Sequence, residues 1–257
     1  MSIEMDFSKC HTPEQAKQHI DNLYDRMLER ARGIIPTSRF MSALSTGTLP
    51  SNALQLFWLN WHGFVAEINN FVQLSYQFHL GFWKENIDLM APLADRIADE
   101  IVHPKSPGHL LLVWKQGEVF GVTREQMLSY PMLPACRILL DWHKGLIYEG
   151  TMAEFWSSAV WEEYVGYWAR DFRGALLKNG YREEQLVYFR THEEADLKEH
   201  EGTIGHGMFT RIALQRMLEK GMADFRPGYS PEYCALTSLD LFRLFLDAAF
   251  ESGVGKP

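Results

Sequence analysis

Residues 191–200 contain the spacing most suggestive of chemistry, because His192, Asp196 and His200 recur there every four residues. On an α-helix a step of four residues turns the side chain by only about 40°, so the three side chains lie along one face. Two imidazoles and a carboxylate on one face form a ligand set that suits iron and leaves positions open for O2. Glu199 lies in the same sector. The competing interpretation is a solvated helix surface, because charged side chains are abundant in this segment.

Two adjacent carboxylates, Glu162 and Glu163, lie within residues 155–168, a segment that is apolar on nearly every side. A buried carboxylate must pair with a cation, coordinate a metal or find hydrogen-bond donors. Adjacent helical residues point about 100° apart, so we expect one of the two to face inward and the other outward. The alternative is that both lie on a narrow exposed stripe. A metal site in a helical bundle needs such carboxylates from facing helices.

A third candidate pair joins Glu100 to a histidine that follows it, either His103 or His109. His109 opens an apolar run over residues 110–114 and could point into the bundle, whereas His103 precedes Pro104, where a helix would be ending. For each histidine a cap or surface position is the other interpretation. The sequence offers no usable pattern for the remaining histidines, among them His143 and His206.

The elements that must position these side chains are helices. Thr12, Pro13 and Gln15 form a capping-box pattern at the start of a helix expected to reach about residue 31. Another is expected to kink near Pro92. Further helices are expected over residues 51–79, 84–101, 109–120, 134–144, 151–177, 182–220 (one helix or two) and 230–252, and a short one is expected to open at residue 123. No alternating β pattern and no linker appears. The sequence therefore predicts an all-α, single-domain bundle of about seven main helices over residues 1–257.

Composition narrows the function classes. The 257 residues are 46% hydrophobic and 13% aromatic, with a net charge of -8 and no basic cluster, which argues against nucleic-acid binding. The three cysteines, Cys10, Cys136 and Cys234, match no CxxC pattern, so neither a disulfide framework nor a thiolate zinc site is expected. No apolar stretch is long enough to cross a bilayer and no secretion signal is visible, which predicts a cytoplasmic protein with no membrane partner.

Taken together, these segments resemble the heme-oxygenase-like diiron oxidases, relatives in fold of the TenA and PqqC proteins, over roughly residues 50–250. His192-x3-Asp196 is similar to the family's H-x3-D-x2-H helix. Glu162-x3-Gly166-x-Trp168 and His109 with Gly121-Val122 downstream resemble two further family segments, in the expected order. The resemblance implies a heme-oxygenase-like fold. It selects Glu162, rather than Glu163, as a ligand.

The resemblance also implies two Fe(II) ions, with O2 as co-substrate. The ligands that it implies are Glu100, His109, Glu162, His192, Asp196 and His200. The implied activity is the oxidation of a small molecule by desaturation, cleavage, hydroxylation or N-oxygenation. An amino acid or a derivative in specialised metabolism is the favoured substrate, and oxidative decarboxylation of a fatty acid is the alternative within the family. A homodimer is expected.

The sequence departs from the family pattern at two places. The family's last histidine lies three residues after the aspartate, where this chain has Glu199, so either His200 or Glu199 is the expected ligand. The family's first glutamate lies three or seven residues before the histidine, where this chain has Ser106 and Val102. Glu100, nine residues before His109, is chosen because the Pro-rich segment between them could absorb a two-residue insertion.

Two rival hypotheses remain. One is a metal-free enzyme of the TenA or PqqC kind, which works with acid–base groups and, in TenA, a cysteine, for which Cys136 is the only obvious counterpart. The other is a non-catalytic helical binding protein. A polar substrate head would need an anchor such as Arg137, Arg170 or Arg190, although each of these arginines is equally suited to the surface.

Overall fold

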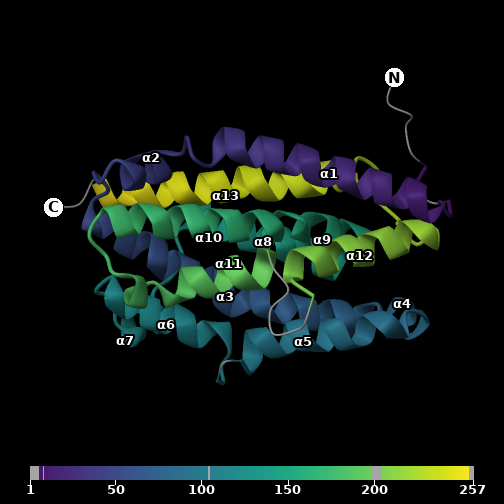
Figure 1. Ribbon diagram of the computed structural model, residues 1–257, viewed down its shortest axis with the longest axis horizontal. Helices are drawn as coiled ribbons and strands as arrows, with labels where there is room; N and C mark the ends of the chain where they lie inside the picture. The colour runs from purple at the N-terminus through teal and green to yellow at the C-terminus, as the bar shows by residue number, and fades with distance from the viewer. Residues whose placement is uncertain (1–5, 8, 104, 198–203, 255–257) are drawn as a thin grey trace.

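Helices make up the regular structure in the computed structural model, which describes residues 6–7, 9–103, 105–197 and 204–254. Among these residues there is no strand, so the all-α prediction is confirmed (Figure 1). In chain order the helices are α1 (Pro13–Ile34), α2 (Arg39–Ser45), α3 (Ser51–Phe78), α4 (Leu80–Glu85), η1 (Ile87–Leu89), α5 (Met90–Ile101), α6 (His109–Val119), α7 (Arg124–Ser129), α8 (Pro134–Glu149), α9 (Met152–Ala159), α10 (Trp161–Lys178), η2 (Glu183–Gln185), α11 (Val187–Leu197), α12 (His206–Glu219) and α13 (Pro231–Val254).

The long helices run roughly parallel to the longest axis of the molecule and stack in layers (Figure 1). α1 and α2 lie along one side against α13, which also packs on α3, α8 and α9. α10 and α11 pack against each other in the middle, and α5, α6 and α7 lie along the opposite side. Fully buried aromatic side chains fill the space between the layers, including Trp58, Trp156, Trp168, Phe172 and Phe242. Large apolar surfaces buried in this way supply most of the stability of such a bundle.

Several predicted helices have different boundaries in the structure. The capping box at Thr12 is present as expected, and the Thr12 backbone N–H donates to Oε1 of Gln15. The segment expected as one helix over residues 151–177 is two, α9 and α10, which divide at Val160. Pro92 does not kink a helix. It lies in the first turn of α5, where its missing N–H costs no helical hydrogen bond. Such divisions give the chain more helices than the seven predicted.

The division at Val160 matters for the site. α10 begins at Trp161, which places Glu162 and Glu163 in its first turn. Free backbone N–H groups and the positive end of the helix dipole favour carboxylates there. Glu163 forms a bidentate ion pair with Arg211 of α12, with both N–O distances at 2.8 Å. Both carboxylates are partly buried, with 22% of the Glu162 side chain and 13% of the Glu163 side chain exposed. Glu162 is the one that Arg211 leaves available to side chains of α5 and α12.

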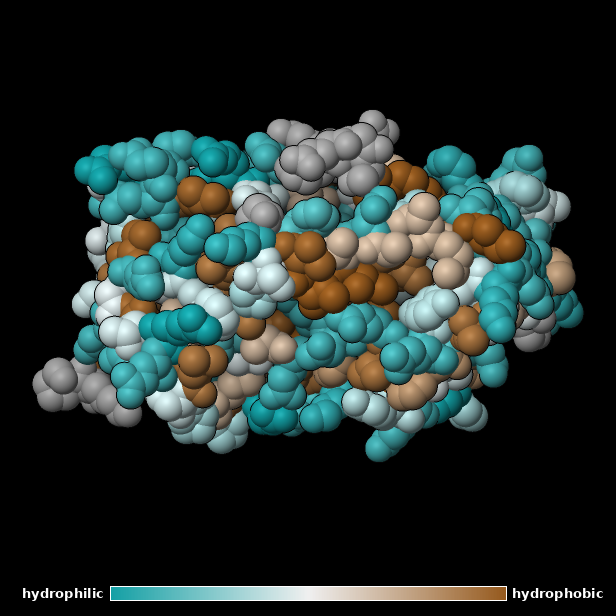
Figure 2. Space-filling model, turned by 90° about the horizontal axis from the view of Figure 1, so that it is seen from below, coloured by the Kyte–Doolittle hydropathy of each residue, from teal (hydrophilic) through white to brown (hydrophobic). Residues whose placement is uncertain are grey.

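One side of the molecule carries apolar side chains at its surface. Figure 2 shows them gathered near the middle of the face below α5 in Figure 1. Ile87 before α5, Ile101 at its last position and Val102 just after it are among the exposed large apolar residues. Nowhere in the described part of the chain does a helix combine the length and the apolar character needed to span a membrane.

Gly166 sets how closely α10 approaches α11. A Cβ atom on Gly166 would lie 2.6 Å from Cγ of Leu197 and 3.0 Å from Cβ of Asp196. We expect Gly166→Ala to lower the free energy of unfolding by about 1–3 kcal/mol, because the two helices must separate to admit the methyl group. Gly174→Ala, on the same helix but with nothing within 4 Å, should be neutral or stabilise by up to about 1 kcal/mol. Urea denaturation of both variants tests this, and equal effects would contradict it.

Candidate metal centre

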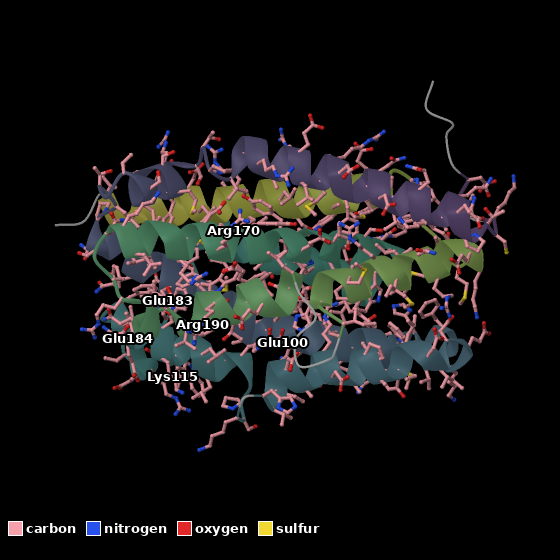
Figure 3. All side chains as sticks on the ribbon, in the orientation of Figure 1. Glu100, Lys115, Arg170, Glu183, Glu184 and Arg190 are labelled. Carbon is pink, nitrogen blue, oxygen red and sulfur yellow. The ribbon has the colours of Figure 1, made fainter. Side chains whose placement is uncertain are left out.

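Side chains from three helices meet inside the bundle. Glu100 of α5, Glu162 of α10 and His206 of α12 each offer a ligand atom, and these atoms lie within 4.8 Å of one another. Figure 3 shows Glu100 near the end of α5 that leads toward α6. Glu100 and Glu162 are predicted site residues, whereas His206 is not. Histidine nitrogen and carboxylate oxygen at such spacing are ligand types that hold iron in helical bundles.

Glu100 is brought to His109 by the tight turn between α5 and α6. Gly108 has a φ of +65°, and a Cβ atom there would overlap the backbone of Glu100. The turn therefore requires glycine. It sets His109, the first residue of α6, beside Glu100, with 3.3 Å between Nδ1 and Oε2. This is an ion-pair contact rather than a well-directed hydrogen bond, since His109 Nδ1 has no hydrogen-bond partner. His103, the alternative in this pair, is exposed.

His192 and Asp196 lie one turn apart on α11, and both side chains are buried. His192 Nδ1–H donates to the Tyr188 carbonyl at 2.9 Å. This hydrogen bond fixes the tautomer and leaves the lone pair on Nε2, as is usual for histidines that bind metals. The His192 and His109 rings lie 4.7 Å apart between centroids. Oδ2 of Asp196 is buried without a hydrogen-bond partner.

Thus the structure brings together five of the six predicted ligands. His200 and its alternative Glu199 lie outside the described residues. His206 lies within reach of three carboxylates. Its Nδ1 is 3.4 Å from Asp196 and 3.7 Å from Glu162, and its Nε2 is 3.3 Å from Asp99. His206 and Asp99 belong to no repeating pattern, so the sequence alone does not predict them as part of the site.

The cluster holds four carboxylates, on Asp99, Glu100, Glu162 and Asp196. Arg96 forms a short ion pair with Glu162 and donates to the Thr210 hydroxyl at 3.0 Å. Burial would lower the pKa of His206, but hydrogen bonds and charges from the surrounding carboxylates raise it to about 10. His206 and Arg96 therefore supply positive charge that balances part of the carboxylate cluster.

Burial and neighbouring charges shift the pKa values of the other groups in the cluster in different directions. Burial would raise the pKa of Glu100, but the neighbouring His109 lowers it to about 2. Burial lowers the pKa of His192 to about 3, which keeps its imidazole neutral. Burial also raises the pKa of Asp196 to about 6. Perturbations of this size in one cluster are typical of functional sites.

The donor set fits iron. It combines hard carboxylate oxygens with neutral imidazole nitrogen, from facing helices, as bundle iron sites do. The unpartnered Oδ2 of Asp196 and the lone pair on Nε2 of His192 are free to bind a cation. Arg96 contacts Oε2 of Glu162, which leaves Oε1 on the His206 side of the carboxylate.

A cavity of about 100 Å³ adjoins the cluster. Its wall includes four of the clustered side chains, from Glu100, Glu162, His192 and Asp196, together with Arg96. The rest of the wall is mostly aromatic or aliphatic and comprises Trp61, Phe64, Val65, Ile68, Asn69, Val72, His143, Phe155, Ala159, Trp161, Val165 and Tyr188. An apolar chamber with a few polar groups is the usual form of a small-molecule site.

The arginines suggested as substrate anchors and the cysteine suggested as a nucleophile do not line the cavity. Arg137, Arg170 and Arg190 do not line the cavity, and Figure 3 places Arg170 and Arg190 away from Glu100. Arg137 pairs with Glu67. Cys136 is fully buried outside the cavity wall, and burial raises the pKa of its thiol to about 12. The thiolate that a nucleophile requires is thus strongly disfavoured.

His143, in the cavity wall, gives an acid-sensitivity prediction. Burial lowers its pKa from 6.5 to about 3. Between these values His143 is protonated in the unfolded chain but not in the folded one, so the free energy of unfolding falls as the pH drops below 6.5. We expect wild type to lose about 2 kcal/mol more of this free energy between pH 7 and pH 5 than His143→Phe does. Chemical denaturation at both pH values measures this, and an identical loss in wild type and variant would contradict it.

Comparison with solved structures identifies the fold. A CADD-like protein of unknown function from Nostoc punctiforme PCC 73102 matches with a TM-score of 0.65 and 13% identity, over 93% of this chain and 96% of that one. A TenA homologue from Pseudomonas syringae pv. tomato matches with a TM-score of 0.64 and 12% identity, over 96% of each chain. A domain of unknown function with a heme-oxygenase-like fold from Shewanella denitrificans matches with a TM-score of 0.61 and 14% identity, over 95% and 94%.

The chain therefore has the heme-oxygenase-like fold of TenA and CADD-like proteins, as the resemblance in its sequence implied. No protein-family model matches the sequence, and no curated protein matches it significantly. Likeness at such low identity defines the fold alone, and chemistry has to be argued from the site.

Proposed function

We propose that this protein is a non-heme diiron oxidase, which uses O2 to oxidise a small molecule held in the cavity. The observation that carries the proposal is the convergence of carboxylates and imidazoles at a cavity with mostly apolar walls. The expected ligands are Glu100, His109, Glu162, His192 and Asp196, and we add His206. Iron bound by such a set supplies O2 activation.

The chain's own residues position the ligands and shield the cavity side of the cluster from water. The Tyr188 carbonyl holds the His192 ring, and the Tyr188 hydroxyl accepts a hydrogen bond from Trp61 Nε1 at 2.6 Å. These contacts fix two walls of the cavity next to the cluster. Aromatic walls exclude water, which protects reactive oxygen species from side reactions.

The proposed substrate class, an amino acid or a derivative, is the one that the resemblance implies, and the cavity limits where its carboxylate could bind. An amino acid or a derivative needs a cation for its carboxylate. Arg96 is the guanidinium in the cavity wall, and it is already paired with Glu162. A substrate carboxylate would compete with Glu162 for Arg96. Iron bound to Glu162 would ease that competition.

A metal-free enzyme of the TenA kind is the second candidate, because solved TenA homologues share the fold. Its cysteine chemistry has little support here. Cys136 and Cys234 are buried with pKa values raised to about 12, and neither lines the cavity. Acid–base chemistry alone does not require four clustered carboxylates, whereas a metal centre would account for them.

Anaerobic loading with Fe(II) tests the proposal. We expect about two iron ions per chain, followed by O2 uptake and a visible absorption band when O2 is added. Substrate screening then looks for compounds that accelerate O2 uptake. Less than one iron per chain, unchanged by His192→Gln or Asp196→Asn, would overturn the proposal.

A further inference from the structure

His143 is a buried polar residue in the cavity wall that the proposed oxidation does not use. It lies on α8, and its side chain is 2% exposed. Its ring stacks on Trp161, with 5.9 Å between centroids and 25° between planes, and meets Phe64 edge-on at 6.2 Å. Its Nε2 has no hydrogen-bond partner. An unpaired polar atom in an apolar wall is costly unless something binds to it.

The hydrogen bonds around His143 determine which ring nitrogen carries the proton. The Ser158 hydroxyl donates to the Phe155 carbonyl at 2.7 Å. A hydroxyl has one hydrogen, so Ser158 Oγ can only accept from His143 Nδ1, which lies 3.1 Å away. Nδ1 therefore carries the proton and Nε2 carries a lone pair. Burial lowers the pKa of the ring, so that the second proton is absent near neutral pH.

We propose that His143 is a substrate-binding residue, whose Nε2 accepts a hydrogen bond from a neutral hydroxyl or N–H on the apolar part of a small molecule in the cavity. The identification of that molecule as the substrate rests on the proposed function. Its binding does not require iron, because His143 belongs to a part of the wall built from aromatic side chains.

The surroundings of Nε2 favour a neutral donor. Trp161 and Phe64 pack against the ring, and a charged group placed among them would lose its hydration without gaining a counter-ion. A group with no hydrogen to donate, such as an ether or a carboxylate, would leave Nε2 unpaired. The cavity, about 100 Å³, is smaller than the cavity of about 150 Å³ that is known to accept benzene, so a single small ring is the largest body that it suits.

Phenol and fluorobenzene are suitable probes, because they have similar shapes and only phenol can donate. Binding of each to the metal-free protein is measured by calorimetry. We expect His143→Phe, which keeps a flat ring but removes the acceptor, to reduce the phenol-to-fluorobenzene affinity ratio about fivefold to tenfold. His62→Phe is the matched control. His62 is also buried with unpartnered ring nitrogens but does not line the cavity, so the ratio should not change.

Nitrogen NMR of the His143 ring provides a second measurement that does not depend on a variant that folds. Phenol should shift the Nε2 resonance, fluorobenzene should not, and the free protein should show the proton on Nδ1. Ser158→Ala should weaken this tautomer preference and the selectivity for phenol.

The proposal is overturned if neither probe binds, if His143→Phe folds and keeps the wild-type ratio, or if the proton is found on Nε2. These outcomes are independent of iron loading. A failure of the oxidase proposal is seen in iron content and O2 uptake, and a failure of this one in probe selectivity.

Discussion

Replacing His206 with glutamine is expected to weaken iron binding more than about 100-fold, because partners outside the ligand set alone are typically worth 10–100-fold. His206 shares the 4.8 Å cluster with Glu100 and Glu162, and its ring nitrogens face three carboxylates. Glutamine keeps a polar side chain of similar length but lacks the imidazole nitrogen that iron favours. Anaerobic titration with Fe(II), read as iron retained per chain, measures the effect.

Three further variants sharpen this experiment. Asp99→Asn removes the carboxylate 3.3 Å from His206 Nε2 and should cost 10–100-fold, in the range of a supporting residue. His79→Gln, at the end of α3 and outside the cluster, should have no effect. His200→Gln tests the ligand expected from the sequence. Wild-type iron binding by His206→Gln, together with a loss in His200→Gln, would contradict the assignment of His206 and make His200 the ligand.

The fold was largely predictable because its signals are local. The capping box at Thr12 and the lack of β alternation depend on neighbouring residues, and both predictions agree with the structure. Helix boundaries were harder to predict. The break at Val160 interrupts a continuous apolar segment, so the pattern alone does not reveal it. Tertiary packing decides such divisions.

The candidate site was predictable where its residues share a helix or follow a known pattern. His192 and Asp196 lie one turn apart, and that spacing alone places them on one face. The proximity of Glu100 to His109 depends on the Gly108 turn, which no pattern in the sequence reveals. The sequence left His103 and His109 as alternatives for this pair, and the resemblance selected His109. His206 could not be foreseen, because its position depends on how α12 packs back against α11. The periodicity of a helix shows which face is buried, but not which residue of another helix that face contacts.

His143 shows the same limit in another form. Its side chain is held by Ser158, fifteen residues away on the next helix, and its environment comes from α3 and α10 as well. A lone histidine on an apolar helix face is typical of an ordinary core residue. The donor and acceptor roles around it are what distinguish it, and those require the three-dimensional arrangement.

Arg96→Met is expected to destabilise the metal-free protein by about 3 kcal/mol, because it leaves Glu162 without its guanidinium partner. The estimate is at the low end for a broken ion pair, since the Glu162 side chain is still 22% exposed and water can reach it. The variant also loses the hydrogen bond to Thr210 and the contact of the guanidinium with the Trp156 ring at 5.2 Å. For a chain of this size the loss corresponds to a fall in Tm of roughly 10 °C. Arg170→Met is the control. Arg170 is exposed and pairs with its neighbour Asp171, so its loss should cost less than about 0.5 kcal/mol.

Metal binding should reverse much of this loss, which separates a role in the site from a purely structural one. Without Arg96, a divalent cation becomes the main counter-charge for Glu162, so the variant should gain more stability from metal than the wild type does. Any ligand that binds only the folded state stabilises it according to its affinity and concentration. Thermal melts with and without Mn(II), which avoids oxidation by air, measure the two gains. An equal gain in both proteins would mean that Arg96 and the metal do not share Glu162. Glu162 would then be a structural ion-pair partner, and the metal set would have to be completed from Glu100, Asp196 and the histidines.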